Sequence, residues 1–112
     1  MVTVEMKSLG DPPGSLASLA GPIYPEDVDG LLDGIADAAV VVGGRLYVDM
    51  SGVTLCGSDG IRLLLELKAR VEAMGGFLRI VDPHPHVRSV LEKARLVEVL
   101  AVFDSLDEAA RA

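Results

Sequence analysis

The sequence predicts a small α/β domain with a mixed, mostly parallel sheet of four to five strands and about four helices. Apolar residues alternate between a spacing of two and a helical spacing along the chain, and Gly and Pro mark most of the changes. The predicted order is strand, strand, then helix and strand in turn to a final helix. Crossovers through helices make neighbouring strands parallel, so only the first two strands form an antiparallel hairpin. We expect residues 1–112 to form a single domain.

The first half of the chain supplies the hairpin, one helix and one strand. Residues 2–7 alternate apolar and polar side chains, as in a half-buried strand, and residues 15–20 form the returning strand. Pro25 is favourable in a first helical turn, and apolar residues follow at helical spacing to Ala39. Gly30 and Gly34 weaken this helix by about 1 kcal/mol each relative to Ala, which we attribute to close packing on the sheet. Residues 45–50 alternate again as a strand.

The second half is predicted to contain three helices and two strands. A wide apolar face extends from Ile61 to Met74, includes Leu65, and stops at a Gly-Gly turn. Residues 77–81 form a short strand, and Pro85 opens the next helix. We expect a further strand over residues 99–102. Ser105 and Glu108 match a capping box that starts the last helix.

Composition excludes several classes of function. The chain has 10 Lys and Arg against 17 Asp and Glu, a net charge of −7, which disfavours binding to nucleic acid or to anionic membranes. No apolar run approaches the roughly 20 residues of a membrane span, and no signal peptide is visible. The single cysteine rules out an intramolecular disulfide. We expect a cytoplasmic protein that binds neither nucleic acid nor membrane; the oligomeric state is not predicted.

The segment from Val48 to Ile61 is the most informative stretch for function. It leads from a predicted strand through a loop into the strongest helix, and such loops hold the binding sites of open α/β sheets. Ser58, Asp59 and Gly60 fall at the start of the helix. The simplest interpretation makes Ser58 an N-cap and Asp59 a favourable first-turn charge, each worth about 0.3 to 1 kcal/mol.

Other candidate chemistries lack support in the sequence. The segment has too few glycines and no Lys for a nucleotide-binding loop. Asp82, His84 and His86 resemble a metal-binding group, but alternating prolines explain them as well and no third ligand at a suitable spacing stands out. Cys56 lies among apolar neighbours, as expected of a buried thiol. We therefore expect no metal, no cofactor and no enzymatic activity.

From Leu46 to Ala110 the chain resembles the STAS family, specifically bacterial anti-sigma factor antagonists. The resemblance rests on a Leu-Tyr-Val-Asp-Met strand, on Ser51-Gly52-Val53-Thr54, and on Gly57-Ser58-Asp59-Gly60-Ile61 before a Leu-rich helix. The closing Ser105-Leu106-Asp107-Glu108 also fits. The resemblance implies partner switching. In this mechanism the antagonist binds an anti-sigma factor that is also a serine kinase of the histidine-kinase-like fold, and phosphorylation of the antagonist breaks the complex.

The chain departs from the family pattern at the decisive position. Family members usually carry Asp-Ser-Ser-Gly or Asp-Ser-Thr-Gly, which places Gly57 at the Asp, Ser58 at the first hydroxyl and Asp59 at the phosphoacceptor. Tyr24 likewise stands where the family commonly has Asp. Three hypotheses follow: Asp59 partly mimics a phosphate, Ser58 has become the acceptor, or the switch is lost. We favour lost or altered regulation, because moving one residue along a helix rotates the side chain by about 100°.

The resemblance implies a regulatory binding module whose partner meets one surface. We expect that surface to include Gly57, Ser58, Asp59 and Gly60, with Arg62 and Glu66 on the following helix. Two alternatives remain open: a STAS regulatory subunit of a transporter ATPase or other complex, and a small ligand-binding α/β domain that uses the same loop.

Overall fold

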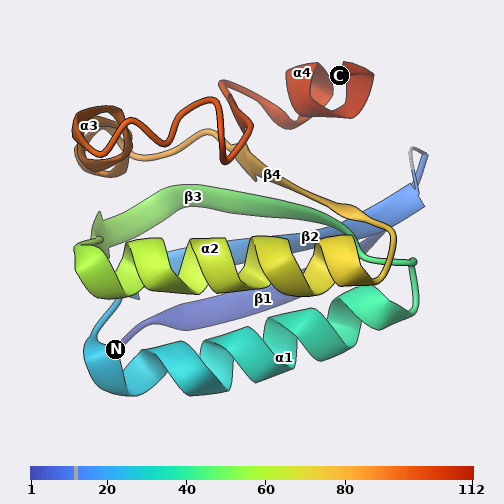
Figure 1. Ribbon diagram of the computed structural model, residues 1–112, viewed down its shortest axis with the longest axis horizontal. Helices are drawn as coiled ribbons and strands as arrows, with labels where there is room; N and C mark the ends of the chain where they lie inside the picture. Colours follow the sequence, from blue (N-terminus) through green and yellow to red (C-terminus); the bar gives the residue numbers. More distant parts are fainter. Residues whose placement is uncertain (12) are drawn as a thin grey trace.

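The computed structural model describes residues 1–11 and 13–112 and contains one five-stranded sheet flanked by helices (Figure 1). The strands lie in chain order, β1-β2-β3-β4-β5. The elements are β1 (Thr3–Gly10), β2 (Pro13–Pro22), the 3-10 helix η1 (Pro25–Asp27), α1 (Val28–Val40), β3 (Arg45–Leu55), α2 (Ser58–Ala73), β4 (Phe77–Val81), α3 (Pro85–Lys93), β5 (Val102–Phe103) and α4 (Leu106–Arg111).

The pairing confirms the predicted mixed, mostly parallel sheet. β1 and β2 form an antiparallel hairpin in regular register from Thr3 opposite Ala20 to Gly10 opposite Pro13. The pairs β2–β3, β3–β4 and β4–β5 are parallel, because a helix or a longer connection lies between the strands of each pair. The carboxyl ends of these parallel strands therefore lie side by side at one end of the sheet, where α2 begins (left side of Figure 1).

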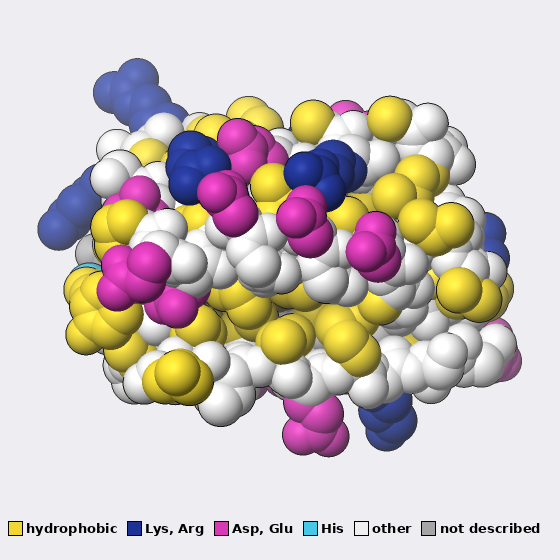
Figure 2. Space-filling view, turned by 90° about the horizontal axis from the view of Figure 1, so that it is seen from below, with side chains coloured by type: hydrophobic (Ala, Val, Ile, Leu, Met, Phe, Trp, Pro, Cys, Tyr) yellow, Lys and Arg dark blue, Asp and Glu magenta, His cyan; other side chains and the backbone are white. Residues whose placement is uncertain are grey.

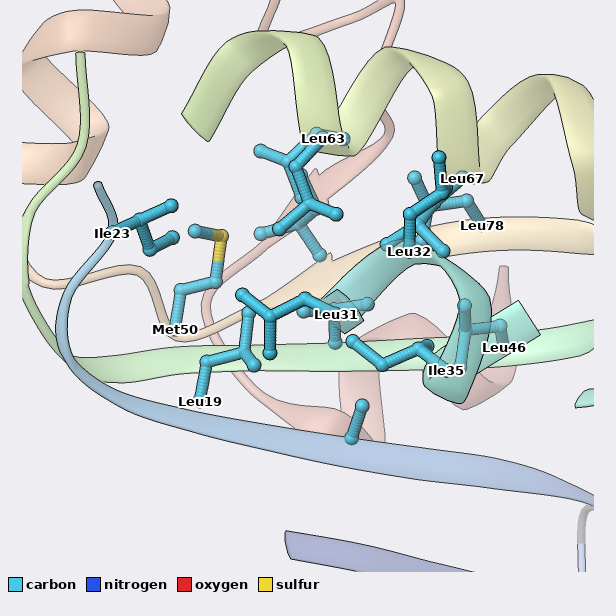
Figure 3. Close-up of a cluster of buried hydrophobic side chains, with 14 of the residues drawn as sticks. Leu19, Ile23, Leu31, Leu32, Ile35, Leu46, Met50, Leu63, Leu67 and Leu78 are labelled. Atoms are coloured by element: carbon cyan, nitrogen blue, oxygen red, sulfur yellow. The ribbon is translucent and has the colours of Figure 1, made fainter. Parts of the chain in front are cut away.

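The main core lies between the sheet and helices α1 and α2. Leu63 and Leu67 of α2 point towards α1 and the sheet, where Leu31 and Leu46 lie in the same cluster (Figure 3). Val87 and Leu91 of α3 belong to this cluster too. A second cluster on the other face of the sheet packs Tyr47 and Val81 against Ala109 of α4. Aliphatic side chains thus fill the core, as the low aromatic content predicts.

Strand β3 is longer than the sequence suggested. The segment after Met50 was expected to be a loop, but β3 continues to Leu55 by pairing with the end of β2. Register shifts after Ser18 and Gly21 accompany this extension, and the Ile23 N–H donates to the Leu55 carbonyl over 3.0 Å. Pairing with a neighbouring strand, which local polarity does not reveal, decides where β3 ends.

The prediction for the last strand was wrong in position. Residues 99–102 were expected to be extended, but turns occupy most of residues 94–101 and β5 contains only Val102 and Phe103. The Leu100 N–H donates to the Leu96 carbonyl, and Ala101 has a φ of 50°. The chain therefore turns just before β5, which pairs with β4. Leu100 is fully buried, and burial of this side chain outweighs the strand propensity of its neighbours.

Two packing predictions were also wrong. β1 was expected to be half-buried, but it lies at the sheet edge, where Val4 is 41% and Met6 37% exposed. Gly30 and Gly34 were expected to pack closely on the sheet, yet both lie on the outer side of α1, and a Cβ at either position would meet no atom within 4 Å. The α1 residues that do face the core are Val28, Leu31, Leu32, Ile35, Ala36 and Ala39.

Candidate functional site

The segment Gly57–Gly60 forms the opening turn of α2, just beyond the carboxyl end of β3. Gly57 is the N-cap, with φ of −107°, and Ser58 is the first helical residue. The expectation that Ser58 caps the helix was therefore wrong: helix α2 has no side-chain cap hydrogen bond, and Ser58 is exposed. Asp59 in the first turn is half-buried and favourable near the positive end of the helix dipole.

Gly60 fixes how closely this turn approaches the core. It is buried, and a Cβ at this position would overlap the Sγ of Cys56 and lie 3.3 Å from the Cys56 Cβ. Cys56 is itself only 1% exposed, and burial raises the pKa of its thiol to about 11. The neutral thiol therefore packs as a small apolar group in the core. Gly60 is required here for space, and its lack of a side chain lets α2 begin directly over Cys56.

Two exposed apolar side chains lie beside the opening turn. The backbone hydrogen bond from Ile23 to Leu55 joins the end of β2 to the end of β3, one residue before Tyr24. Tyr24 is 43% and Leu55 41% exposed. The Tyr24 N–H donates to Asp27 Oδ2 over 3.0 Å, which holds the chain where it enters η1. The carboxyl ends of β2 and β3 therefore present a tyrosine and a leucine to solvent.

The outer side of α2 continues this surface with charged side chains. Arg62 Nη1 lies 3.3 Å from Glu66 Oε2 and 3.8 Å from Asp29 Oδ1 of α1. A second pair, Arg70 with Asp33, joins the same two helices over 2.9 Å. Figure 2 shows a band of alternating basic and acidic side chains along one face of the molecule. In the described part of the chain no basic side chain forms an ion pair with Asp59.

Comparison with known proteins identifies the family. The family model described as "STAS domain" matches residues 7–109. The chain belongs to the STAS domain family. No match was found among the curated proteins.

Solved structures share the fold of this STAS domain. An anti-sigma factor antagonist from Mycobacterium paratuberculosis superposes with a TM-score of 0.82 at 22% identity, over 99% of this chain and 92% of that one. The anti-sigma factor antagonist SpoIIAA in its unphosphorylated form gives a TM-score of 0.79 at 19% identity, over 97% and 93%. An anti-sigma-factor antagonist (STAS) domain protein from Planctomyces limnophilus gives 0.68 at 17%, over 96% and 95%. At these identities the likeness concerns the fold.

The STAS domain brings the predicted site residues together on one element. Gly57, Ser58, Asp59 and Gly60 form the first turn of α2, and Arg62 and Glu66 follow on its next two turns. Sequence reasoning missed two neighbours. Leu55 was placed in a loop without a role, and Leu65 was assigned to the buried face of the helix but is 38% exposed. Leu63 is buried in its place, and in a run of three leucines the periodicity alone does not distinguish them.

The histidine group has a structural role. The His86 N–H donates to the Nδ1 of His84 over 3.1 Å, so His84 caps α3, and the His84 N–H donates to the Met50 carbonyl. Across residues 1–11 and 13–112, no three His, Cys, Asp or Glu side chains are placed to hold a metal ion. The longest described helix, α2, has 16 residues, and no described helix combines the length and hydropathy needed to span a bilayer.

Proposed function

We propose that this STAS domain is an anti-sigma factor antagonist that binds a kinase-type anti-sigma factor in the cytoplasm and has no catalytic activity of its own. The proposal rests on the exposed opening turn of α2, at which the family's phosphorylation motif is present in altered form as Gly57-Ser58-Asp59-Gly60. Three structures with the same fold are described as anti-sigma factor antagonists or their domains. Binding the anti-sigma factor would release its sigma factor and so regulate transcription.

The chemistry of the surface supports a protein partner. Tyr24, Leu55 and Leu65 expose apolar area, and protein interfaces are centred on such aromatic and aliphatic side chains. Asp59 adds a carboxylate that no basic side chain among residues 1–11 and 13–112 pairs with, next to the exposed Ser58. A complementary partner therefore offers an apolar surface with a basic side chain opposite Asp59. Arg62 and Glu66 lie further along the same helix, where charged side chains commonly form the rim of an interface.

Regulation by phosphorylation at residue 59 is absent in this proposal. Asp59 occupies the position of the acceptor and has no hydroxyl, so the kinase finds nothing to phosphorylate there. Asp59 carries one negative charge, whereas phosphoserine carries about −1.5 to −2 and three acceptor oxygens. Ser58 points about 100° away around the helix axis from residue 59. The complex is therefore not dissolved by phosphorylation of this turn.

A pull-down from the source organism tests this function. The native chain, Asp59→Ser and the control Asp107→Ser are compared; Asp107 lies on α4, on the far face of the sheet, and its replacement removes the same charge. We expect native chain and control to capture the same kinase-like anti-sigma factor. Leu55→Asp places a charge on the exposed apolar part of the proposed binding surface and is expected to weaken capture at least about tenfold. Failure of the native chain and of Asp59→Ser to capture any such protein would contradict the proposal.

A further inference from the structure

The two edges of the sheet differ in their capacity to pair with another chain. β5 has two residues and offers almost no edge, whereas β1 has eight residues and pairs with β2 without a bulge. β1 contains no proline, and every residue from Thr3 to Ser8 is exposed. An edge strand that is long, regular and open presents unpaired backbone N–H and C=O groups to any other strand.

The side chains of β1 divide into two sets that favour pairing. Val4 and Met6 lie opposite Leu19 and Ala17, which are core residues beneath α1, yet Val4 and Met6 are more than a third exposed. They extend the core face of the sheet beyond its last covered strand. Glu5 and Lys7 lie on the opposite face, next to each other and with opposite charges.

We propose that two copies of this chain pair through antiparallel β1 strands centred on Met6, so that the two sheets join into one. In this register Glu5 of each copy lies opposite Lys7 of the other, which forms two cross-strand charge pairs. Met6 lies opposite Met6, and Val4 opposite Ser8. Centring the pairing on Glu5 or on Lys7 would place like charges directly opposite each other, which is destabilising. Charge complementarity therefore selects a second copy and one register.

The neighbouring elements are compatible with this dimer despite the net charge of −7. The acidic residues Asp29 and Asp33 of α1 pair with arginines of α2. Because α2 contacts β4 whereas α1 contacts β2 and β1, these acids lie on the side of α1 away from β1. In Figure 2 apolar side chains gather beside the band of charged ones on this face. The opening turn of α2 is not part of the contact, so the dimer is independent of the proposed function.

Sedimentation equilibrium from micromolar to millimolar concentration tests the charge pairs. We expect the native chain to form dimers, Lys7→Glu to weaken the dimer about tenfold or more, and the exchanged pair Glu5→Lys with Lys7→Glu to restore it. Both residues involved, Glu5 and Lys7, are exposed, so we expect the fold to be retained, which circular dichroism verifies. A native chain that stays monomeric throughout, or a dimer unchanged by Lys7→Glu, would overturn the proposal.

Cross-linking tests the register. Met6→Cys places the new thiols of two copies directly opposite each other, whereas Ser8→Cys on the same face places them about 13 Å apart along the strands. Cys56 is buried and does not compete. Mild oxidation is expected to link Met6→Cys into a dimer and to leave Ser8→Cys mostly monomeric. Equal linkage of the two variants, or linkage of Ser8→Cys alone, would rule out pairing centred on Met6.

Discussion

Replacing Gly60 by Ala tests how the opening turn of α2 is held in place. The added Cβ would overlap the Sγ of Cys56 and lie 3.3 Å from the Cys56 Cβ, in a site that is fully enclosed. Overpacking of this kind costs about 1–3 kcal/mol. Ala also improves helix propensity by up to about 1 kcal/mol at a helical position. We expect Gly60→Ala to lower the free energy of unfolding by about 1–2 kcal/mol.

Combining Gly60→Ala with a second substitution, Cys56→Ala, forms a double-mutant cycle. Cys56→Ala removes the overlapping sulfur. Alone it loses a small buried group, worth about 1 kcal/mol. In the presence of Cys56→Ala, the substitution Gly60→Ala is expected to cost nothing or to stabilise, because the overlap is gone and the remaining contacts are 3.3 Å to the residue-56 Cβ and 3.8 Å to Ile23 Cδ1. The coupling free energy between the two positions is then about 1–3 kcal/mol, as expected for residues in contact.

Urea unfolding of the four chains measures this coupling, provided that the m-value stays constant. Gly34→Ala is the matched control, since it makes the same substitution in a helix where a Cβ meets no atom within 4 Å. Additive effects of Gly60→Ala and Cys56→Ala would refute the contact. So would a Gly60→Ala chain as stable as the control.

Three further predictions concern other parts of the chain. Gly34→Ala is expected to stabilise the protein by about 0.5–1 kcal/mol, because the position is helical and exposed; a lower unfolding midpoint in urea would contradict this. Arg95→Gly is expected to stabilise by up to about 1 kcal/mol, because Arg95 has a φ of 58° after α3, at the position that Gly75 occupies after α2 with a φ of 86°; thermal unfolding measures it, and no gain would refute the strain. Cys56 is expected to react with iodoacetamide at pH 8 about 100-fold more slowly than a free thiol or slower, since burial raises its pKa to about 11. The neutral thiol is the stable buried form, so its contribution to stability is lost as the pH rises from about 9 towards 11; equal reactivity before and after unfolding in urea would contradict this account.

The order of elements followed from the sequence because local signals marked each one. Pro25 and Pro85 do lie in first helical turns, and the Ser105 hydroxyl accepts a hydrogen bond from the Glu108 N–H as an N-cap. The Gly75-Gly76 turn ends α2, with the Gly76 N–H donating to the Val71 carbonyl. Such signals depend on a few neighbouring residues, so a single sequence contains them.

The parts that sequence reasoning missed depend on contacts between distant residues. β3 ends at Leu55 because β2 pairs with it that far, and β1 is exposed because it is an outer strand of the sheet. Gly30 and Gly34 gave the pattern of a packed helix, but the side of α1 that meets the sheet lies elsewhere on its circumference. The predicted site residues do lie in the first turns of α2, whereas the exposure of Leu55 and Leu65 depends on the three-dimensional arrangement.

Phosphopeptide mass spectrometry tests most directly whether α2 opens with a recognition turn that has lost its acceptor. The native chain and Asp59→Ser are each incubated with the captured kinase-type anti-sigma factor and ATP. We expect no phosphate on the native chain and phosphate on residue 59 of the Asp59→Ser variant, because the opening turn then presents a hydroxyl where the kinase acts. Quantitative phosphorylation of Ser58 in the native chain, or an unmodified Asp59→Ser variant, would contradict it.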